Sequence, residues 1–211
     1  MRPPAARLSP VPDATAEAIL DAASRRFLHY GYAKTTMSEI ASDCNMSPGN
    51  LYRYFPSKLD IAEAFAHRLR SDHLEELRKT SQAPNLSTAE RLRAYFRTKL
   101  KLAYDRYHDR PRAYELSQAI LKERLSFASE WEAAEAMIIE DILNRGAEAG
   151  DLVLANRTRT ARLLQDVFFR FTSSAIYFEG DYETLARDLD DVMDLVLDGF
   201  AWRHSGFVRG S

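Results

Sequence analysis

Cysteine is nearly absent from this chain of 211 residues, in which Cys44 is the one thiol. A single thiol excludes an internal disulfide framework and is typical of a reducing compartment, so we expect a cytoplasmic protein. Apolar runs of about eighteen residues are also lacking, which predicts no transmembrane helix and no membrane partner. The opening segment MRPPAARLSPVP has no apolar signal core, and residues 1–12 are expected to form a disordered arm.

An excess of charge of one sign is lacking as well. The chain carries 29 lysine and arginine residues against 31 aspartate and glutamate residues, which gives a net charge of −2. Residues 1–60 are balanced too, with seven basic and six acidic side chains. Any binding of nucleic acid must therefore come from a local arrangement of side chains and not from a generally basic surface.

Glycine and proline are sparse, with 8 of each, and they separate long stretches of helical period. The fold class predicted is all-α, with a first domain over residues 13–60, a helical bundle over 61–204 and a tail over 205–211. The expected helices are Asp13–Tyr30, Thr36–Cys44, Ser47–Phe55, Ser57–Thr80, Ser87–His108, Pro111–Phe127, Ser129–Ala149, Asn156–Phe178 and Tyr182–His204.

Two short helices in the first domain have clear start signals. Thr36-Met-Ser-Glu39 matches a capping box, in which the threonine and glutamate side chains bind each other's backbone N–H groups. Ser47 is the next N-cap residue, and Pro48 stands at the first helical position, where its missing N–H costs nothing. Asn45, between the two helices, tolerates the left-handed conformation. This arrangement predicts a helix-turn-helix, whose second helix enters the DNA major groove.

The second helix of this pair has more polar groups than its own chain can satisfy. The apolar positions spaced to hold the pair together are Ile40, Ala41, Met46, Leu51 and Phe55. The remaining side carries Ser47, Pro48, Gly49, Asn50, Tyr52, Arg53 and Tyr54. Hydroxyl, amide and cationic groups of this kind contact phosphates and base edges in DNA. Short surface helices of proteins that bind no DNA show the same pattern, so the pattern alone leaves both interpretations open.

Residues 18–61 resemble the N-terminal domain of the TetR family of transcriptional regulators. The motifs that carry the resemblance are F-x-x-x-G-Y, T-T-M-S-x-I-A, S-P-G-N-L-Y-R-Y-F and the following S-K-L, in this order and spacing. One position departs from the family pattern, because Asn45 replaces the usual glycine of the turn. The resemblance implies a homodimeric repressor that a small-molecule effector releases from an inverted-repeat operator in double-stranded DNA, with no cofactor. An activator fits the sequence as well.

The resemblance also assigns roles to individual residues. Thr36 and the backbone at Met37 are expected to contact phosphate, and Ser38 to approach a base. The base-reading positions are occupied by Ser47, Pro48, Gly49 and Asn50, and the phosphate-contacting positions by Tyr52, Tyr54 and Lys58. Arg53 matches a position that faces either the flanking DNA backbone or solvent.

The last two expected helices carry apolar residues over a wide arc, which is typical of a helix covered on two sides. A core helix of a monomer explains this pattern, and so does a dimer interface. The resemblance favours a four-helix interface between two copies of the chain. The interface residues expected are Phe168, Phe171, Ala175, Phe178, Leu189, Val192, Val196 and Phe200.

The resemblance further implies that residues 61–204 are a regulatory and dimerisation domain with an effector pocket. The candidates for its lining are Tyr104, Tyr107, Phe127, Trp131, Met137 and Phe169. Aromatic residues at helical spacing are also ordinary core residues. If they line a pocket, they suit an apolar or aromatic effector better than a strongly charged one.

The sequence gives little support to other chemistry. Glu63 with His67 and Asp105 with His108 each share a helix face, but two isolated pairs lack the ligand set of a helical metal site, so no metal is expected. The chain has no HExxH, GxGxxG, Walker or G-x-S-x-G motif, so an enzyme is not expected. The alternative to a regulator is a helical ligand-binding or protein-interaction module whose DNA-binding domain has lost its function.

Overall fold

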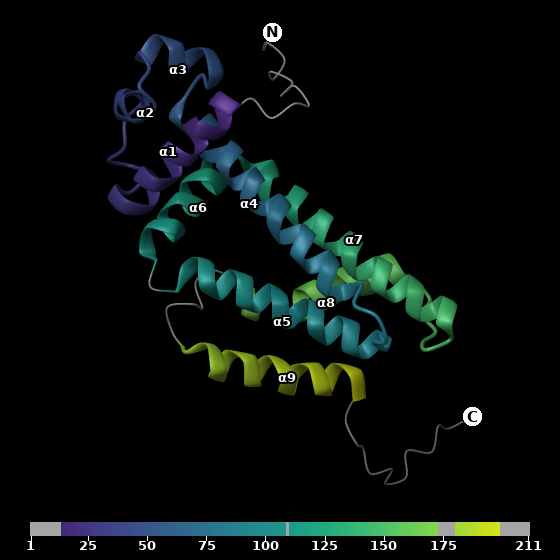
Figure 1. Ribbon diagram of the computed structural model, residues 1–211. Coiled ribbons are helices and arrows are strands. Elements are labelled where there is room, and N and C mark those ends of the chain that lie inside the picture. Colours follow the sequence, from purple (N-terminus) through teal and green to yellow (C-terminus); the bar gives the residue numbers. More distant parts are fainter. Residues whose placement is uncertain (1–13, 109, 173–179, 199–211) are drawn as a thin grey trace, which may run out of the picture. The chain divides into compact units, whose positions relative to one another are not determined.

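The computed structural model describes residues 14–108, 110–172 and 180–198, and within them all regular secondary structure is helical (Figure 1). The prediction of an all-α chain is confirmed. The helices are α1 (Ala14–Tyr30), α2 (Met37–Asp43), α3 (Pro48–Tyr54), α4 (Lys58–Ser81), α5 (Thr88–Tyr107), α6 (Pro111–Glu123), α7 (Leu125–Ala149), α8 (Arg157–Val167), the 3-10 helix η1 (Phe169–Phe171) and α9 (Tyr182–Asp198). In these described ranges no helix is both long and apolar enough to cross a membrane.

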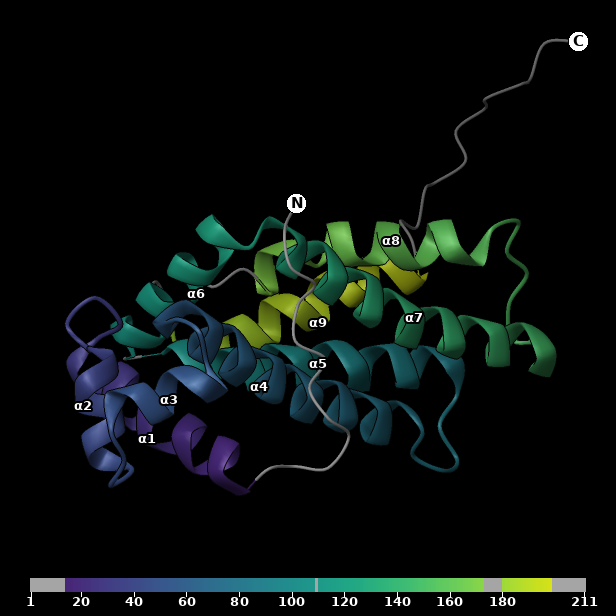
Figure 2. The ribbon, with the colours of Figure 1, turned by 90° about the horizontal axis from the view of Figure 1, so that it is seen from above.

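The chain divides into two compact units. The first unit comprises residues 1–74 and 106–133, and the second comprises 75–105 and 134–211. The first unit is therefore larger than the domain expected over 13–60, because α6 and the start of α7 belong to it. Helices α1 and α6 contact each other and lie next to each other in Figure 1, and Figure 2 shows the same helices from above.

The core of the first unit is apolar and nearly free of solvent. Ile19, Ala23 and Phe27 follow one another at four-residue spacing on α1 and are each 0% exposed. Ile40 on α2 and Leu51 on α3 pack into the same cluster, also at 0% exposure. Full burial of a large aliphatic or aromatic side chain stabilises a fold by roughly 1.5–3 kcal/mol. This core therefore fixes α2 and α3 against α1.

Two glycines end helices as the sequence predicts. Gly31 follows α1 with φ +95°, and its N–H donates to the carbonyl of Phe27 at 3.1 Å. Gly150 follows α7 with φ +81°. Positive φ is a conformation that glycine adopts without strain, so both residues act as C′ terminators.

The predicted boundary between α6 and α7 is wrong. The structure breaks the chain at Arg124, whereas the sequence pattern continues α6 to Phe127 and starts the next helix at Ser129. Arg124 Nε donates to Glu63 Oε2 at 2.8 Å, and its Nη2 donates to Asp60 Oδ1 at 2.9 Å. This double ion pair to α4 fixes the break, and the apolar periodicity carries no sign of it.

The predicted length of α8 is also wrong. The helix ends at Val167, and Phe168 and Phe171 enter the core of the second unit from the 3-10 turn that follows. The rings of Phe168 and Phe96 lie 4.2 Å apart between centroids. Residues 173–179 and 199–204 of the last two expected helices lie outside the described residues.

Ion pairs join α9 to α5 in the second unit, where the two helices run side by side (Figure 1). Arg93 Nη2 donates to Asp194 Oδ1 at 2.6 Å, and Arg97 Nε donates to Asp190 Oδ1 at 2.7 Å. These groups are partly exposed, so each pair contributes up to about 1 kcal/mol. Burial of the apolar residues Leu185, Leu189 and Met193 supplies most of the free energy that holds α9 in the second unit.

One ion pair of the second unit is almost entirely buried. Lys99 Nζ on α5 donates to Glu135 Oε2 on α7 at 2.8 Å, and the two side chains are 14% and 7% exposed. Removal of one partner would leave the other charge in a poorly solvated site without its counter-ion.

We therefore expect Lys99→Met to lower the free energy of unfolding by roughly 3 kcal/mol, because Glu135 would lose its counter-ion. The double variant Lys99→Met/Glu135→Leu should recover most of that loss, since it buries no charge. Urea denaturation followed by circular dichroism measures both values. Equal losses in the single and double variants would contradict burial of the pair.

In the first unit, a partly buried polar contact joins side chains of α4, α5 and α7. Arg106 Nη2 donates to His73 Nε2 at 2.6 Å, and the Arg106 guanidinium lies 5.4 Å from the ring centroid of Trp131. Burial and the neighbouring Arg106 charge lower the pKa of His73 to about 3. His73 is therefore neutral at physiological pH and accepts a hydrogen bond from Arg106.

This lowered pKa makes stability depend on pH. Below the ordinary histidine pKa of 6.5, unfolded chains bind a proton that the folded protein does not bind, so stability falls as the pH drops from about 6.5 toward 3. After an allowance for solvent screening, His73 should cost about 1 kcal/mol at pH 5. His73→Gln keeps an acceptor for Arg106 but does not titrate, so its loss of stability between pH 7 and pH 5 should be smaller. An unchanged loss in thermal unfolding would show that His73 is not the titrating group.

Candidate nucleic-acid interface

Helices α2 and α3 form the predicted helix-turn-helix (Figure 1). Asn45 in the turn has φ +54°, the left-handed conformation expected of it. Its neighbour Met46 donates its N–H to the carbonyl of Ala41 at 3.0 Å, which closes the turn. Asparagine thus adopts the conformation that a glycine would take at this position.

The capping box at the start of α2 is confirmed, and it has a consequence for DNA contacts. The hydroxyl and the N–H of Thr36 each donate to Glu39 Oε2 at 2.8 Å, and Thr36 Oγ1 accepts from the N–H of Glu39 at 3.3 Å. The bonds from Thr36 lower the pKa of the Glu39 carboxyl. Because Glu39 engages both donors of Thr36, the groups at the start of α2 that remain to face an anion come from Met37 and Ser38.

Helix α3 is capped as predicted and presents its polar residues to solvent. Ser47 Oγ accepts from the N–H of Asn50 at 3.2 Å. Apart from its chain neighbours and the backbone of its own helix, no atom of the described residues lies within 4 Å of the position that a Cβ of Gly49 would occupy, so the start of α3 is open to a partner. Tyr52 and Tyr54 are 51% and 37% exposed. The remaining predicted residues of this helix are exposed at Pro48 and Arg53 and partly buried at Asn50.

Lys58 is used within the chain. Its ammonium lies 2.7 Å from the carbonyl oxygen of Tyr32, 2.8 Å from that of Thr35 and 3.5 Å from that of Ala33. It also lies 4.4 Å from the ring centroid of Tyr32. Burial lowers the pKa of Lys58. Contact with a DNA phosphate would therefore require this ammonium to leave the loop between α1 and α2.

Arg26, for which the sequence predicted no role, joins α1 to α2. Its Nε donates to Asp43 Oδ2 at 2.5 Å and its Nη2 to Asp43 Oδ1 at 2.9 Å, while Nη1 lies 3.3 Å from Glu39 Oε1. The hydrogen bond from Arg26 lowers the pKa of Asp43. The signal in the sequence was the four-residue spacing of Glu39 and Asp43, which places both carboxylates on one side of α2.

The six residues expected to line an effector pocket are divided between the two units. Tyr107, Phe127 and Trp131 belong to the first unit, and Tyr104 belongs to the second, where its ring lies 5.5 Å from that of Tyr182. The other two belong to the second unit and lie on its surface, with Met137 71% exposed and Phe169 62% exposed. In the single chain both side chains lie on the solvent side of their segments, and their place in an effector pocket stays a prediction.

The residues expected at a dimer interface separate into three groups. Phe168, Phe171 and Leu189 are buried in the core of their own chain, so they offer no surface to a second copy. Val192 is partly buried and Val196 is 39% exposed. The last three expected residues, Ala175, Phe178 and Phe200, lie outside the described residues. Apolar side chains that the expectation missed are exposed at Leu163, Val167 and Leu195.

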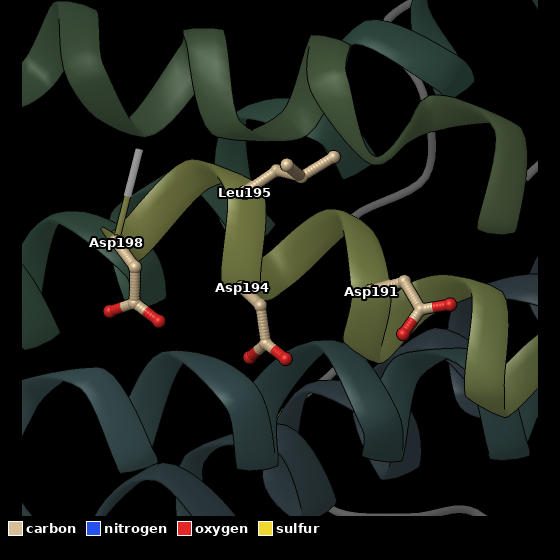
Figure 3. A pocket seen from close by; sticks show the side chains of 4 residues that line it. All are labelled: Asp191, Asp194, Leu195 and Asp198. Carbon is tan, nitrogen blue, oxygen red and sulfur yellow. The ribbon is translucent and has the colours of Figure 1, made fainter. Parts of the chain in front are cut away.

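An open depression on α9 has an acidic lining (Figure 3). Its residues are Asp191, Asp194, Leu195 and Asp198, all on the same helix. Asp194 is also bound by Arg93 of α5. This lining does not suit an apolar effector. Within the described ranges no cluster of three or more histidine, cysteine, aspartate or glutamate residues is arranged to hold a metal ion.

Comparison with known proteins identifies both halves of the chain. Residues 19–65 match the family model for bacterial regulatory proteins of the tetR family, and residues 88–193 match a tetracyclin repressor-like C-terminal domain. A curated relative, an HTH-type transcriptional regulator of Mycobacterium tuberculosis, is 36% identical over 90 residues, which are 43% of this chain and 44% of the relative. The chain spans less than half the length of the curated relatives that it matches.

Two solved structures are similar over almost the whole chain. A transcriptional regulator from Cytophaga hutchinsonii is 25% identical with a TM-score of 0.68, and the match covers 88% of this chain and 98% of that one. Thermus thermophilus FadR, a TetR-family transcriptional repressor in complex with lauroyl-CoA, is 26% identical with a TM-score of 0.63, and the match covers 93% of this chain and 100% of that one. Together with the helix-turn-helix geometry, these matches show that the chain belongs to the TetR family of transcriptional regulators.

Proposed function

We propose that the protein is a homodimeric repressor that binds an inverted-repeat operator and leaves it when a small-molecule effector binds. The observation that carries this proposal is the two-sided character of α3. Leu51 is 0% exposed and anchors the helix, while the next residue, Tyr52, lies about 100° further around the helix axis and is 51% exposed. A tyrosine held outward on a short, capped helix is suited to contact a DNA backbone.

The proposed contacts follow from what each residue presents. Ser47, Pro48, Gly49 and Asn50 lie at the open start of α3, where their small or amide side chains suit the edges of bases. Tyr52, Tyr54 and Arg53 are exposed and suit phosphates. At the start of α2, we assign Met37 and Ser38 to the DNA and Thr36 to a supporting role, because Glu39 engages both of its donors.

We propose a dimer interface made of the outer faces of α8 and α9. Leu163 and Val167 of α8 are 50% and 48% exposed, and Leu195 and Val196 of α9 are 49% and 39% exposed. Apolar side chains exposed on an outer surface favour burial against a protein partner. A two-fold dimer would present two copies of α3 to successive major grooves, roughly 34–36 Å apart, which requires an inverted-repeat operator.

The effector is proposed to be largely apolar. The Thermus relative supports a small-molecule effector, because that protein was solved in complex with lauroyl-CoA, whose acyl chain is apolar. Lauroyl-CoA is therefore the first compound to test here. An effector releases DNA only to the extent that it prefers the conformation in which the two DNA-binding domains are wrongly spaced.

Selection from random duplex DNA tests the proposed function. The purified protein should retain sequences that share an inverted repeat whose half-sites lie one helical turn apart. Sequencing of the retained DNA measures the enrichment. A folded, dimeric preparation that enriches no sequence at low salt would overturn the proposal and favour a module with a vestigial DNA-binding domain.

Two variants serve as controls for that selection. Asn50→Ala should change the preferred bases within each half-site, since it removes an amide that can read a base edge. Tyr52→Phe should leave the enriched sequence unchanged and weaken binding about equally for all sites, since it removes a phosphate contact. Identical effects of the two variants across the library would contradict the division into base-reading and phosphate-contacting residues.

For Lys58 we propose a positioning role in place of direct phosphate contact. Lys58→Gln should weaken operator binding about tenfold, roughly 1.4 kcal/mol, because the loop before α2 loses its cation. Hydrogen exchange at the amides of residues 32–36 should become faster in the DNA-free variant.

Lys34→Gln is the matched control, because Lys34 is an exposed lysine in the same loop. It removes one positive charge and should leave hydrogen exchange unchanged. The two variants should lower the salt dependence of binding equally. The salt slope is the change in the logarithm of the binding constant with the logarithm of salt concentration. If its magnitude fell by an additional amount of about 0.9 for Lys58→Gln alone, Lys58 would be shown to leave the loop and contact a phosphate.

A further inference from the structure

The hydroxyl of Tyr95 is buried without a hydrogen-bond partner. Tyr95 lies on α5 in the second unit and is 0% exposed. Its Oη is enclosed, and no group in the part of the chain that the structure describes donates to it or accepts from it. Folded proteins rarely leave a buried hydroxyl in this state, because its lost hydration is not replaced. The hydroxyl therefore points to a group that the described residues do not provide.

The surroundings of Tyr95 combine aromatic rings with one ion pair. The Tyr95 ring meets Phe96 edge-on, with centroids 5.0 Å apart, and Phe96 lies 4.2 Å from Phe168. Lys99 follows Tyr95 by four residues and so shares its side of α5. Lys99 is bound at 2.8 Å by Glu135 of α7, which is 5% exposed.

This environment keeps the phenol protonated. Burial, and to a smaller extent the Glu135 carboxylate, raises the pKa of Tyr95 well above its ordinary value. Tyr95 is therefore a hydrogen-bond donor throughout the physiological pH range. Its missing partner is an acceptor, because a buried O–H donor without an acceptor costs free energy of folding.

The charge balance limits which acceptor can bind. Lys99 and Glu135 neutralise each other, and both are removed from solvent. An anionic ligand would have to take Lys99 from Glu135 and leave that carboxylate without its counter-ion. A cationic ligand would have to take Glu135 from Lys99 and leave that ammonium without its counter-ion. An uncharged oxygen acceptor on an apolar molecule meets the need of Tyr95 and disturbs neither charge.

We propose that Tyr95 Oη donates a hydrogen bond to an uncharged carbonyl, ester or thioester oxygen of an otherwise apolar effector that binds in the core of the second unit, between α5 and α7. This inference rests on the proposed function, in which an effector acts on the C-terminal domain. It adds the residue that recognises the effector and the chemistry of the recognised group. None of the six residues expected to line a pocket takes this role.

The first test asks whether the chain or bound water already satisfies the hydroxyl. Wild-type protein and Tyr95→Phe are refolded from urea and desalted, so that bound small molecules are removed, and their melting temperatures are compared. The variant should melt at the same temperature or higher, because it keeps the ring and loses an unsatisfied donor. A melting temperature lower by several degrees would overturn the proposal, because it would show that water or protein already fills the hydrogen bond. Tyr30→Phe is the matched control, since the Tyr30 side chain is exposed on α1.

The second test uses probes that share an eight-carbon chain. The neutral acceptors 2-octanone and methyl octanoate and the neutral thioester S-methyl thiooctanoate are compared with octanoate, which carries a charge. At least one neutral acceptor or thioester should raise the melting temperature of the wild-type protein, and Tyr95→Phe should weaken its binding at least tenfold. Tyr30→Phe should bind it as the wild type does. Protection by none of these acceptors, or equal protection of Tyr95→Phe, would overturn the proposal.

Operator binding in the same preparations separates this inference from the proposed function. A probe that binds through Tyr95 and releases wild-type protein from its operator, but not Tyr95→Phe, supports both. A chain that binds the probe through Tyr95 but binds no DNA retains the effector site and loses the proposed repressor function. If no probe binds through Tyr95 but the protein still binds its operator, the proposed effector site at Tyr95 is wrong and the proposed repressor function stands.

Discussion

The DNA-binding domain depends on the packing of α2 and α3 against α1. Each of the two helices has seven residues, and isolated helices shorter than roughly 12–15 residues are marginal in water. Burial of Ile40, Ala41 and Leu51 supplies the stability that the helices lack on their own. The same burial decides which side of α3 remains outside. The outward position of Tyr52 and the open backbone at Gly49 are therefore consequences of how the core forms.

Features whose partners lie within a few residues could be predicted from the sequence. The capping box of Thr36 and Glu39, the turn at the left-handed Asn45 and the cap at Ser47 each depend on bonds between groups no more than five residues apart. Local chemistry of this kind leaves a fixed spacing in the sequence, so the helix-turn-helix was found residue by residue.

Interactions between distant residues left no such spacing. Arg26 and Asp43 are 17 residues apart, Lys58 and Tyr32 are 26 apart, and Arg124 reaches back across 64 residues to Asp60. The break between α6 and α7 and the inward position of the Lys58 ammonium both depend on contacts of this range. Periodicity also failed to tell core from surface in α9, because its apolar arc covers both. Leu189 belongs to the core and Val196 to the outer surface, and the tertiary packing of α9 against α5 makes that division.

The side chains proposed to contact DNA and the hydroxyl proposed to contact an effector differ in exposure. Tyr52, Arg53 and Tyr54 on α3 are exposed, so water solvates their polar groups until DNA replaces it at little cost. In the second unit the Tyr95 hydroxyl is buried, so its unmade hydrogen bond costs about 1–3 kcal/mol in the absence of a ligand. A ligand that supplies this bond in one conformation and not in another gains a differential affinity of similar size. Couplings of typically 1–3 kcal/mol are what allosteric effectors require, so a single buried hydroxyl is sufficient in magnitude to bias a conformational equilibrium. A surface hydroxyl would not bias the equilibrium, because water would satisfy its hydrogen bond in both conformations.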